Sequence, residues 1–270
     1  MKWRDSLAFA ALTLGALAMM GPFLWMLSTS LKPMAEQFDM ALIPHSPTLA
    51  NYPKLFEIMP FHLLLWNSMK LALLSVAGQL LTCSMAAFIF AVVKFPFRNA
   101  LFLLLLVTLM VPAQVTTIPQ FIIFKWLSLY GTQAPLYLPS FLGGAFGTFL
   151  MRQYFLTIPI ELAEAARIDG ASLSRIFFTI YLPLSKPALA AFAIFAFLFS
   201  WNDLFSALIY LPSDLTQTTL TVGLALFQSQ YSGQWTLMMA AALLSVAPII
   251  LAFFAAQRHF IQGIAMSGFR

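Results

Sequence analysis

The sequence predicts an all-α integral membrane protein with six transmembrane helices and one polar loop built from two short helices. Apolar residues make up 61% of the 270 residues and charged residues only 9%, whereas a soluble domain carries about 25% charged residues. The apolar residues also gather in long uncharged runs, and a helix needs roughly 20 such residues to cross a membrane. A late polar segment, residues 152–186, interrupts the runs and predicts the loop.

The first half of the chain supplies four of the six predicted spans. Residues 6–31 form an uncharged run longer than the core of a cleaved signal peptide, so we expect a span there. Polar residues and prolines in residues 32–61 predict an external loop. The next three uncharged runs predict the spans at residues 71–93, 99–124 and 126–151, and Pro112 and Pro119 interrupt the span 99–124 near its far end.

The second half supplies the polar loop, residues 152–186, and two further spans, residues 187–210 and 235–257. The fourth predicted span contains a glycine cluster. Small residues let helices approach each other closely in lipid, so this cluster favours a tight helix pair. Its members are Gly143, Gly144 and Gly147.

Helix start and stop signals divide the polar loop into two short helices. Pro159, Glu161 and Glu164 suit a helix start, because proline fits the first turn and carboxylates favour the positive end of the helix dipole. Gly170 suits the end of that helix, since glycine readily adopts the left-handed conformation that closes one. Ser172 is then placed to cap a second helix.

The second short helix is predicted to be amphipathic and to end at a proline. Its apolar residues recur at spacings of three and four, while its polar residues fall on other faces. Pro183 and Pro187 end the helix and lead into the fifth span. The predicted apolar face consists of Leu173, Ile176, Phe177 and Ile180.

The polar loop carries a spaced motif. Its core reads Glu-Ala-Ala at 164–166 and Asp-Gly-Ala at 169–171, followed by Phe177 and by Leu182-Pro183. In this spacing it resembles the EAA loop of binding-protein-dependent ABC importer permeases, and the resemblance extends over essentially the whole chain. Further segments are similar to the carbohydrate-uptake, maltose-type branch: Ile158-Pro159, Pro-Leu-Ser-Lys-Pro at 183–187, Trp201-Asn202-Asp203 and the tail at 257–263.

The resemblance implies a permease subunit that imports sugar by alternating access in an ATP-driven complex. The implied partners are a second permease subunit, two ATP-binding cassette ATPase subunits, an external solute-binding protein, membrane lipid and the sugar. No cofactor is expected in this chain, because ATP is used by the partner subunits. The residues that the resemblance assigns to ATPase coupling are Glu164, Ala165, Ala166, Asp169, Gly170, Ala171, Arg175 and Phe177.

An alternative interpretation places the two short helices on the lipid headgroups. A helix that lies on a membrane surface has no need of the Asp-Gly turn between two short helices, which favours the coupling role.

The distribution of basic residues predicts the orientation in a bacterial or archaeal inner membrane. With the N-terminus inside, ten of the fourteen Lys and Arg fall on the inner side and four on or near the outer side. Cytoplasmic loops carry the excess of Lys and Arg, so both termini and the polar loop are expected in the cytoplasm. The net charge of +5 does not indicate a nucleic-acid partner, because the basic residues are dispersed at the ends of apolar runs.

Motifs for catalysis and metal binding are absent from the sequence. Neither a G-x-x-x-x-G-K-[ST] phosphate loop nor a G-x-S-x-G nucleophile motif occurs, so any ATPase must be another subunit and a hydrolase reaction has no candidate residues. The single cysteine, Cys83, excludes an internal disulfide and a multi-cysteine metal site. His45, His62 and His259 are far apart, and we predict no catalytic residue and no metal site.

Polar residues within predicted spans are candidates for the substrate path. A charge inside a span is costly, so Asp203 is expected to face a cavity or a partner. An interfacial tryptophan, Trp201, beside a solvated acid is an equally good interpretation, and hydrogen bonds between helices explain the glutamines equally well. The candidates are Asn202, Asp203, Gln79 and Gln114.

A secondary transporter or channel of small polar solutes, without an ATPase, is the alternative function. Such a protein should show a relay of intramembrane charges or an internal repeat, and the sequence shows neither. The sequence does not identify the sugar, the partner permease or the resting conformation, because transporters of different sugars share these features.

Overall fold

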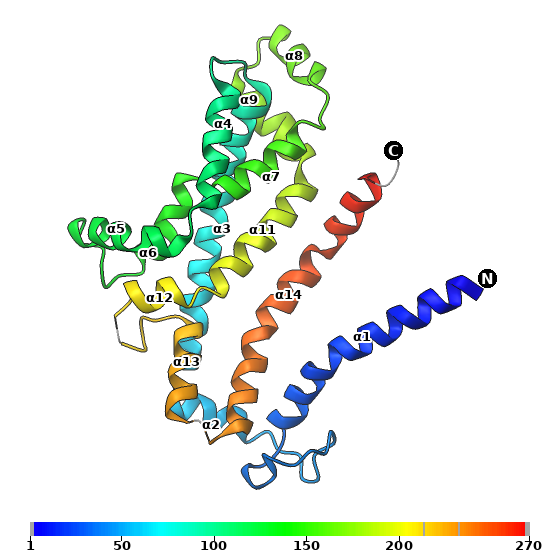
Figure 1. Ribbon diagram of the computed structural model, residues 1–270, viewed down its shortest axis with the longest axis vertical. Coiled ribbons are helices and arrows are strands. Elements are labelled where there is room, and N and C mark those ends of the chain that lie inside the picture. The colour runs from blue at the N-terminus through cyan, green and yellow to red at the C-terminus, as the bar shows by residue number, and fades with distance from the viewer. Residues whose placement is uncertain (1–2, 213, 232, 268–270) are drawn as a thin grey trace. The chain divides into compact units, whose positions relative to one another are not determined.

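The computed structural model describes residues 3–212, 214–231 and 233–267, and all regular secondary structure in them is helical (Figure 1). No β-strand occurs in these residues, so the all-α prediction is confirmed. The side chains of residues 4, 5 and 255–267 lie outside the description, and so does the tail motif at 257–263. The chain divides into two compact units. The first contains residues 1–65 and 220–250, and the second contains residues 66–219 and 251–270.

The first unit contains a long helix, α1 (Trp3–Ser30), that is apolar on every side. Residues 6–25 of α1 are exposed all around the helix, and a helix that is hydrophobic all round suits a membrane span. Its end at Ser28, Thr29 and Ser30 is buried. The other elements of this unit are η1 (Met34–Glu36), α2 (Asn51–Ile58), the start of α3 (Phe61–Val92), α13 (Leu220–Gln230) and the first part of α14 (Trp235–Ser267).

The predicted external loop is built around a buried lysine, Lys32, whose side chain is 0% exposed. Its ammonium group donates a 2.7 Å hydrogen bond to the carbonyl oxygen of Asp39 and lies 4.8 Å from the centre of the Trp25 ring. A charge-assisted hydrogen bond and a cation–π contact together offset the loss of hydration that burial imposes on the ammonium group.

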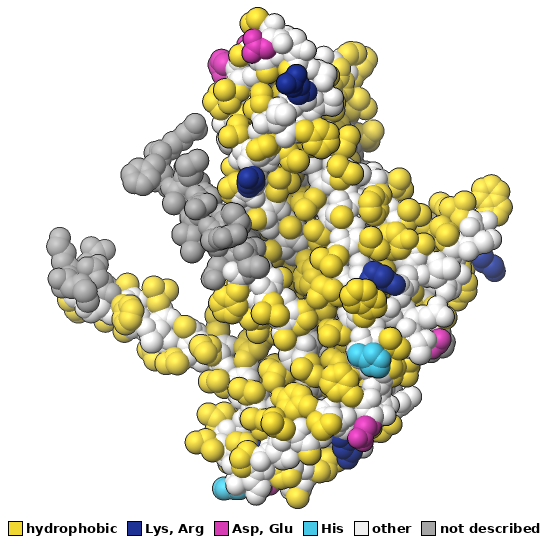
Figure 2. Space-filling view, turned by 180° about the vertical axis from the view of Figure 1, so that it is seen from behind, with side chains coloured by type: hydrophobic (Ala, Val, Ile, Leu, Met, Phe, Trp, Pro, Cys, Tyr) yellow, Lys and Arg dark blue, Asp and Glu magenta, His cyan; other side chains and the backbone are white. Residues whose placement is uncertain are grey.

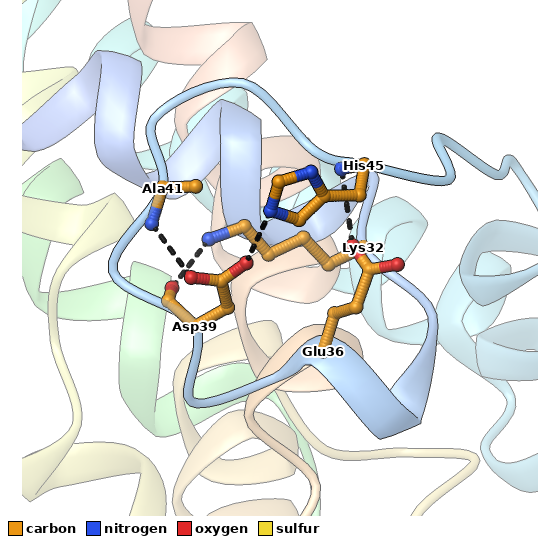
Figure 3. Close-up of polar contacts among 5 residues, drawn as sticks. All are labelled: Lys32, Glu36, Asp39, Ala41 and His45. Atoms are coloured by element: carbon orange, nitrogen blue, oxygen red, sulfur yellow. Dashed lines mark hydrogen bonds and ion pairs between the residues drawn. The ribbon is translucent and has the colours of Figure 1, made fainter.

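Side chains around Lys32 fix the turn that follows it (Figure 3). The Asp39 carboxylate accepts a 3.0 Å hydrogen bond from the backbone N–H of Ala41 and lies 3.2 Å from Nε2 of His45. The backbone N–H of His45 donates to the carboxylate of Glu36 at 3.2 Å. The polar residues of this loop therefore bind to one another and hold a defined shape.

The second unit is a helical bundle with the polar loop at one end and α5, α6 and α12 at the other (Figure 1). Its core consists of side chains from α3, α7, α11 and the polar loop. In chain order its elements are α3, α4 (Arg98–Val107), η2 (Thr108–Met110), α5 (Ala113–Trp126), α6 (Ala134–Tyr137), η3 (Leu138–Leu142), α7 (Ala145–Phe155), α8 (Glu161–Ile168), α9 (Leu173–Ile176), the π-helix η4 (Phe177–Tyr181), α10 (Leu182–Leu184), α11 (Lys186–Trp201) and α12 (Phe205–Tyr210).

Gly147 allows α7 and α11 to pack closely together. A Cβ atom at position 147 would overlap the ring of Phe192 on α11, so only glycine fits without a shift of that ring. The role predicted for the glycine cluster is confirmed at this position.

Four helical segments in the described residues are long and apolar enough to cross a membrane, and two bent pairs raise the number to six when each pair is one span. Hydrophobic side chains accordingly cover most of the face in Figure 2, and charged side chains are sparse on it. The single segments are 6–30, 61–92, 134–155 and 235–254, and the bent pairs are 98–110 with 113–126, at 97°, and 173–184 with 186–201, at 82°.

Several helix bounds differ from the predicted spans. α3 begins at Phe61, ten residues before the expected start of its span, and runs through Lys70, because a single charge does not end a helix. The segment 99–124 is broken at Pro112. Proline forces the preceding residue, Val111, out of the helical conformation and has no N–H to donate.

The fourth and fifth predicted spans differ more. The segment 126–151 is not one helix: α5 ends at Trp126, Ser128 has a positive φ of 58°, and the helical path restarts only at Ala134. The candidate span instead reaches Phe155 and includes Arg152, a residue expected in the polar loop. The segment 187–210 is broken after Trp201, where α11 ends.

Candidate functional site

The first short helix of the polar loop, α8, begins two residues after Pro159. Ile160 is its N-cap residue, and Glu161 and Glu164 occupy its first turn as predicted. Pro159 therefore precedes the helix instead of lying in its first turn, and its carbonyl oxygen accepts a 3.3 Å hydrogen bond from the N–H of Leu162. The two carboxylates lie where the helix dipole favours negative charge.

The end of α8 is a Schellman motif centred on Gly170. The N–H of Gly170 donates to the carbonyl of Arg167 at 3.0 Å, and the N–H of Ala171 donates to the carbonyl of Ala166 at 2.9 Å. This pair of bonds defines the motif and requires a left-handed residue at the C′ position. Gly170 has a φ of +80°, so the predicted helix stop is confirmed.

The second short helix begins at its predicted cap and then changes type. The Ser172 hydroxyl accepts a 3.3 Å hydrogen bond from the N–H of Arg175. One α-helical turn, α9, continues into the π-helix Phe177–Tyr181 and into α10. π-helical turns are rare and frequently occur at functional sites. Ser185 separates this segment from α11, which leaves at a bend of 82°.

Four side chains anchor the loop in the core of the second unit: Ala163, Ile176, Phe177 and Tyr181 are all buried. The Phe88 ring of α3 lies 5.4 Å from the Phe177 ring and 5.1 Å from the Tyr181 ring. The first pair of rings is tilted and the second is edge-to-face, and an aromatic pair stabilises by about 1 kcal/mol beyond the burial of its area. A movement of the two short helices is therefore coupled to α3, α7 and α11 through packed side chains.

The opposite side of the loop is exposed and chemically mixed. Ile168 is 87% exposed, and Leu162 and Leu173 are 43% and 40% exposed. Glu164 and Arg167 are exposed beside them, and no charged side chain of the loop forms an ion pair within the described residues. An apolar patch with unpaired charges around it is typical of a surface that binds another protein.

Leu162 and Ile168 were not among the predicted site residues, although a signal for them exists. They lie six residues apart, about 120° from each other around α8, and both are on the side of the helix away from the buried Ala163. The prediction for Leu173 was wrong, since its side chain faces outward while Tyr181 takes a place in the core. Leu173 lies in the first turn of α9, before the π-helix, and Tyr181 is the last residue of the π-helix, four positions after the buried Phe177.

The residues predicted for coupling divide into two groups. Ala166 and Ala171 are half-buried against the core, and Phe177 is 3% exposed, so these three face the chain itself. The remaining members are exposed: Glu164, Ala165, Asp169, Gly170 and Arg175.

A small polar pocket in the second unit brings together two of the four predicted substrate-path residues, Gln79 and Asp203. Asp203 lies in the break between α11 and α12, and its carboxylate accepts a 3.0 Å hydrogen bond from the N–H of Ser206. Hydroxyl groups supply most of the other polar lining. The pocket is also lined by Ser68, Leu71, Ser75, Leu136, Ser140, Phe199, Ser200 and Thr219.

The pocket has a volume of about 40 Å³. Small-molecule sites usually measure several hundred Å³, whereas about 15 Å³ holds one water molecule. In this conformation the pocket therefore accommodates water and is too small for a sugar.

The other two predicted path residues lie apart from this pocket. Asn202 is exposed at the end of α11, and its side-chain amide donates a 2.8 Å hydrogen bond to the carbonyl of Leu198. Gln114 is exposed in the first turn of α5.

Comparison with known families identifies the fold. Residues 80–266 match the family model described as "Binding-protein-dependent transport system inner membrane component". The chain belongs to this family. Members are the multi-pass permease subunits of ABC importers and are transport subunits, not enzymes. The alternative of a transporter or channel without an ATPase is therefore set aside.

Several curated permeases are similar to this one. The sn-glycerol-3-phosphate transport system permease protein UgpE of Pectobacterium atrosepticum is 36% identical over 86% of this chain and 84% of its own length. The lactose transport system permease protein LacG of Rhizobium radiobacter is 32% identical, covering 96% and 94%. The arabinooligosaccharides transport system permease protein AraQ of Halalkalibacterium halodurans is 34% identical, covering 99% and 96%.

Solved structures share the fold of this permease. A chain of a bacterial ABC transporter involved in the import of the acidic polysaccharide alginate superimposes with a TM-score of 0.83 at 24% identity, covering 95% of this chain and 96% of that chain. The MetNI methionine ABC transporter in an inward-facing conformation matches with a TM-score of 0.56 at 18% identity, covering 75% and 97%. Both matches show that this chain has a fold found in ABC transporters.

Proposed function

We propose that this permease imports a sugar or a sugar derivative. The substrates in the names of its similar relatives are a polyol phosphate, a disaccharide and oligosaccharides, which share a polyhydroxyl structure. Hydroxyl and amide groups are the side chains that bind such solutes by hydrogen bonds. The pocket around Gln79 and Asp203 offers these groups, and we assign it to the substrate path in a more open conformation.

The complex that we propose holds this chain, a second permease subunit, two ATPase subunits and an external solute-binding protein. The observation that carries the proposal is the polar loop, which is anchored in the helix core on one side and exposes Ile168 and unpaired charges on the other. In the proposed mechanism, ATP binding closes the ATPase pair, and the loop transmits that movement to α3, α7 and α11.

The two groups of coupling residues have different roles in this mechanism. Glu164, Ala165, Asp169, Gly170 and Arg175 lie on the exposed side, and we assign them to contact with the ATPase. Ala166, Ala171 and Phe177 hold the loop against the core, so they transmit the movement without touching the partner.

We place both termini and the polar loop in the cytoplasm. This orientation puts ten of the fourteen basic residues on the inner side, in agreement with the positive-inside rule. It also puts Lys32 and its loop outside the cytoplasm, where the binding protein delivers substrate.

Site-directed cross-linking tests the contact between the loop and the ATPase. The variant Ile168→Cys presents a thiol at the most exposed apolar position of α8, whereas Ala163→Cys on the same helix presents one at a buried position. The native Cys83 is buried, and its labelling in the wild-type chain gives the background signal. After labelling with a photoactivatable thiol reagent, Ile168→Cys should cross-link to the ATPase subunit, and Ala163→Cys should not.

The contradicting result is specific. If the ATPase co-purifies with the Ile168→Cys chain but only lipid cross-links to position 168, the loop lies on the headgroups and the coupling assignment is wrong.

The substrate is identified by a separate experiment. Transport assays with purified binding protein and single sugars identify it independently of the contact between the loop and the ATPase.

A further inference from the structure

A cationic hollow lies at the turn between α3 and α4, remote from the polar pocket. Its volume is about 330 Å³, and its lining comes from one short stretch of the chain: Lys94, Phe95, Phe97, Arg98, Asn99 and Ala100. We propose that this hollow, named here the headgroup site, binds the phosphate group of an anionic membrane lipid. This is a function beyond solute transport, and it does not depend on which side of the membrane the turn occupies.

Positive charge at the headgroup site is uncompensated. The sequence contains no Asp or Glu between Glu57 and Glu161, and neither Lys94 nor Arg98 forms an ion pair among the described residues. The only hydrogen bond given by the Arg98 side chain in this part of the chain is a long one, 3.4 Å, to the carbonyl of Val93. Lys94 is exposed. Both cations therefore have donors available for an anion.

Arg152 strengthens the positive potential behind the site. Its guanidinium group donates a 3.1 Å hydrogen bond to the carbonyl of Phe90 and stacks 4.1 Å above the ring of Phe102. The Phe90 ring contacts both Phe102, at 5.4 Å between centroids, and Phe95 of the site, at 5.9 Å. The rings of Phe102, Phe90 and Phe95 thus connect Arg152 to the hollow. The positive charges of Arg98 and Arg152 repel each other.

The rim of the headgroup site is apolar and exposed. Phe97 is 81% exposed and has a φ of +59°, a conformation that costs a non-glycine residue about 1 kcal/mol. Leu101 and Leu104 of the adjoining helix are 47% and 62% exposed. A soluble phosphate has no apolar group that could contact this rim, whereas the glycerol and acyl groups of a lipid would contact it.

The chemistry therefore selects a phospholipid with net negative charge. Basic pockets beside membrane-spanning helices bind anionic headgroups, and each Lys or Arg near an anionic surface contributes about 1 kcal/mol. A zwitterionic lipid carries its own ammonium group, which the local cations repel.

Native mass spectrometry of the purified full-length chain provides the test. The probe is phosphatidylglycerol, compared with phosphatidylcholine and with inorganic phosphate. Relative to the wild type, the affinity for phosphatidylglycerol should fall about 5-fold for Lys94→Gln and about 30-fold for Lys94→Gln/Arg98→Gln. The charge-preserving variant Lys94→Arg/Arg98→Lys should retain binding, and size-exclusion chromatography checks that each variant is folded.

The matched control is Lys70→Gln/Lys125→Gln. This variant also removes two positive charges. Lys70 lies within α3 and Lys125 in the last turn of α5, both outside the headgroup site, so the affinity for the lipid should not change. Phe97→Ser, which removes part of the rim without a change of charge, should also weaken lipid binding.

Three results would overturn the proposal. The first is an equal loss of lipid in the control and in the double variant. The second is equal binding of phosphatidylcholine, and the third is displacement of the lipid by excess inorganic phosphate, which would mark a site for a soluble anion. Because no ATPase is present in the experiment, its outcome is independent of the coupling assignment.

Discussion

At the scale of single residues, the polar loop depends on one left-handed glycine. Gly170 closes α8 with a φ of +80°, and open space surrounds the position where a Cβ atom would be. A side chain there meets no neighbour, so its cost is backbone strain alone, about 1–2 kcal/mol. Gly131, in the turn between α5 and α6, has nearly the same conformation, a φ of +79° with no atom within 4 Å of a Cβ position.

Gly170 and Gly131 can be compared by the same substitution, because the backbone strain it introduces is the same at both positions. Gly170→Val should lower thermal stability modestly, reduce the amount of ATPase that co-purifies and lower uptake. Gly170→Asn should retain both, because asparagine tolerates the left-handed conformation. Gly131→Val introduces the same strain and should lower stability equally while it leaves ATPase retention unchanged. Equal loss of ATPase in the two valine variants would show that general instability is the cause.

Two serines at the borders of the second short helix differ in their partners. Ser172 accepts the capping hydrogen bond from Arg175, whereas the buried Ser185 hydroxyl has no partner among the described residues. We expect Ser172→Ala to cost about 1 kcal/mol and Ser185→Ala to be neutral or stabilising. Thermal unfolding in detergent micelles measures both, and a clear loss of stability in Ser185→Ala would contradict the assignment.

Residues that act through local backbone rules were predictable from the sequence. Gly170 and Ser172 follow from helix-end chemistry, which depends on a few neighbouring residues. The exposure of Leu173 and the burial of Tyr181 depend on how the second short helix packs against α3 and α7, and no local residue pattern marks that packing. Gln79 and Asp203, 124 positions apart, could be named singly as polar residues in spans, but their meeting in one pocket needed the fold.

At the scale of elements, α7 and α11, the helices before and after the polar loop, pack directly against each other at Gly147 and Phe192. Gly147→Val should force the Phe192 ring to move and cost about 1–3 kcal/mol, the usual range for overpacking. The double variant Gly147→Val/Phe192→Ala should be less destabilised than the sum of the two single variants, because the alanine leaves space for the valine side chain. A thermal-unfolding cycle of the four proteins measures the coupling, and strictly additive effects would refute a direct contact.

Element boundaries were predicted less well than element types. The prediction ends each span at the nearest charged residue. In the structure, α3 continues through Lys70, and the candidate span 134–155 includes Arg152. Both side chains are long enough to carry their charge away from the helix axis. The break after Trp201 lies inside a nearly uncharged run, where hydropathy gives no signal, whereas the break at Pro112 falls at a proline that was predicted to interrupt its span.

At the scale of the whole molecule, charge asymmetry predicts the topology. A reporter that is active only outside the cytoplasm should be active when fused after Asp39 or Asp214 and silent when fused after Arg167. The expectation follows from ten basic residues on the inner side against four on the outer. Activity of the Arg167 fusion would place the polar loop outside, where no ATPase could reach it.

The π-helix at Phe177–Tyr181 has a consequence for how the loop tolerates changes in length. An α-helix turns by about 100° per residue, and a π turn accommodates one residue more than an α turn does. Side chains after Tyr181 are therefore out of phase, by about a quarter turn, with those before Phe177. Deleting one residue from 178–180 would restore an α-helical path and swing α10 and the bend at Ser185 around the helix axis. The number of residues in this segment, more than their identity, aligns the ATPase-facing surface with the membrane span, so insertions and deletions here should uncouple transport even where substitutions are tolerated.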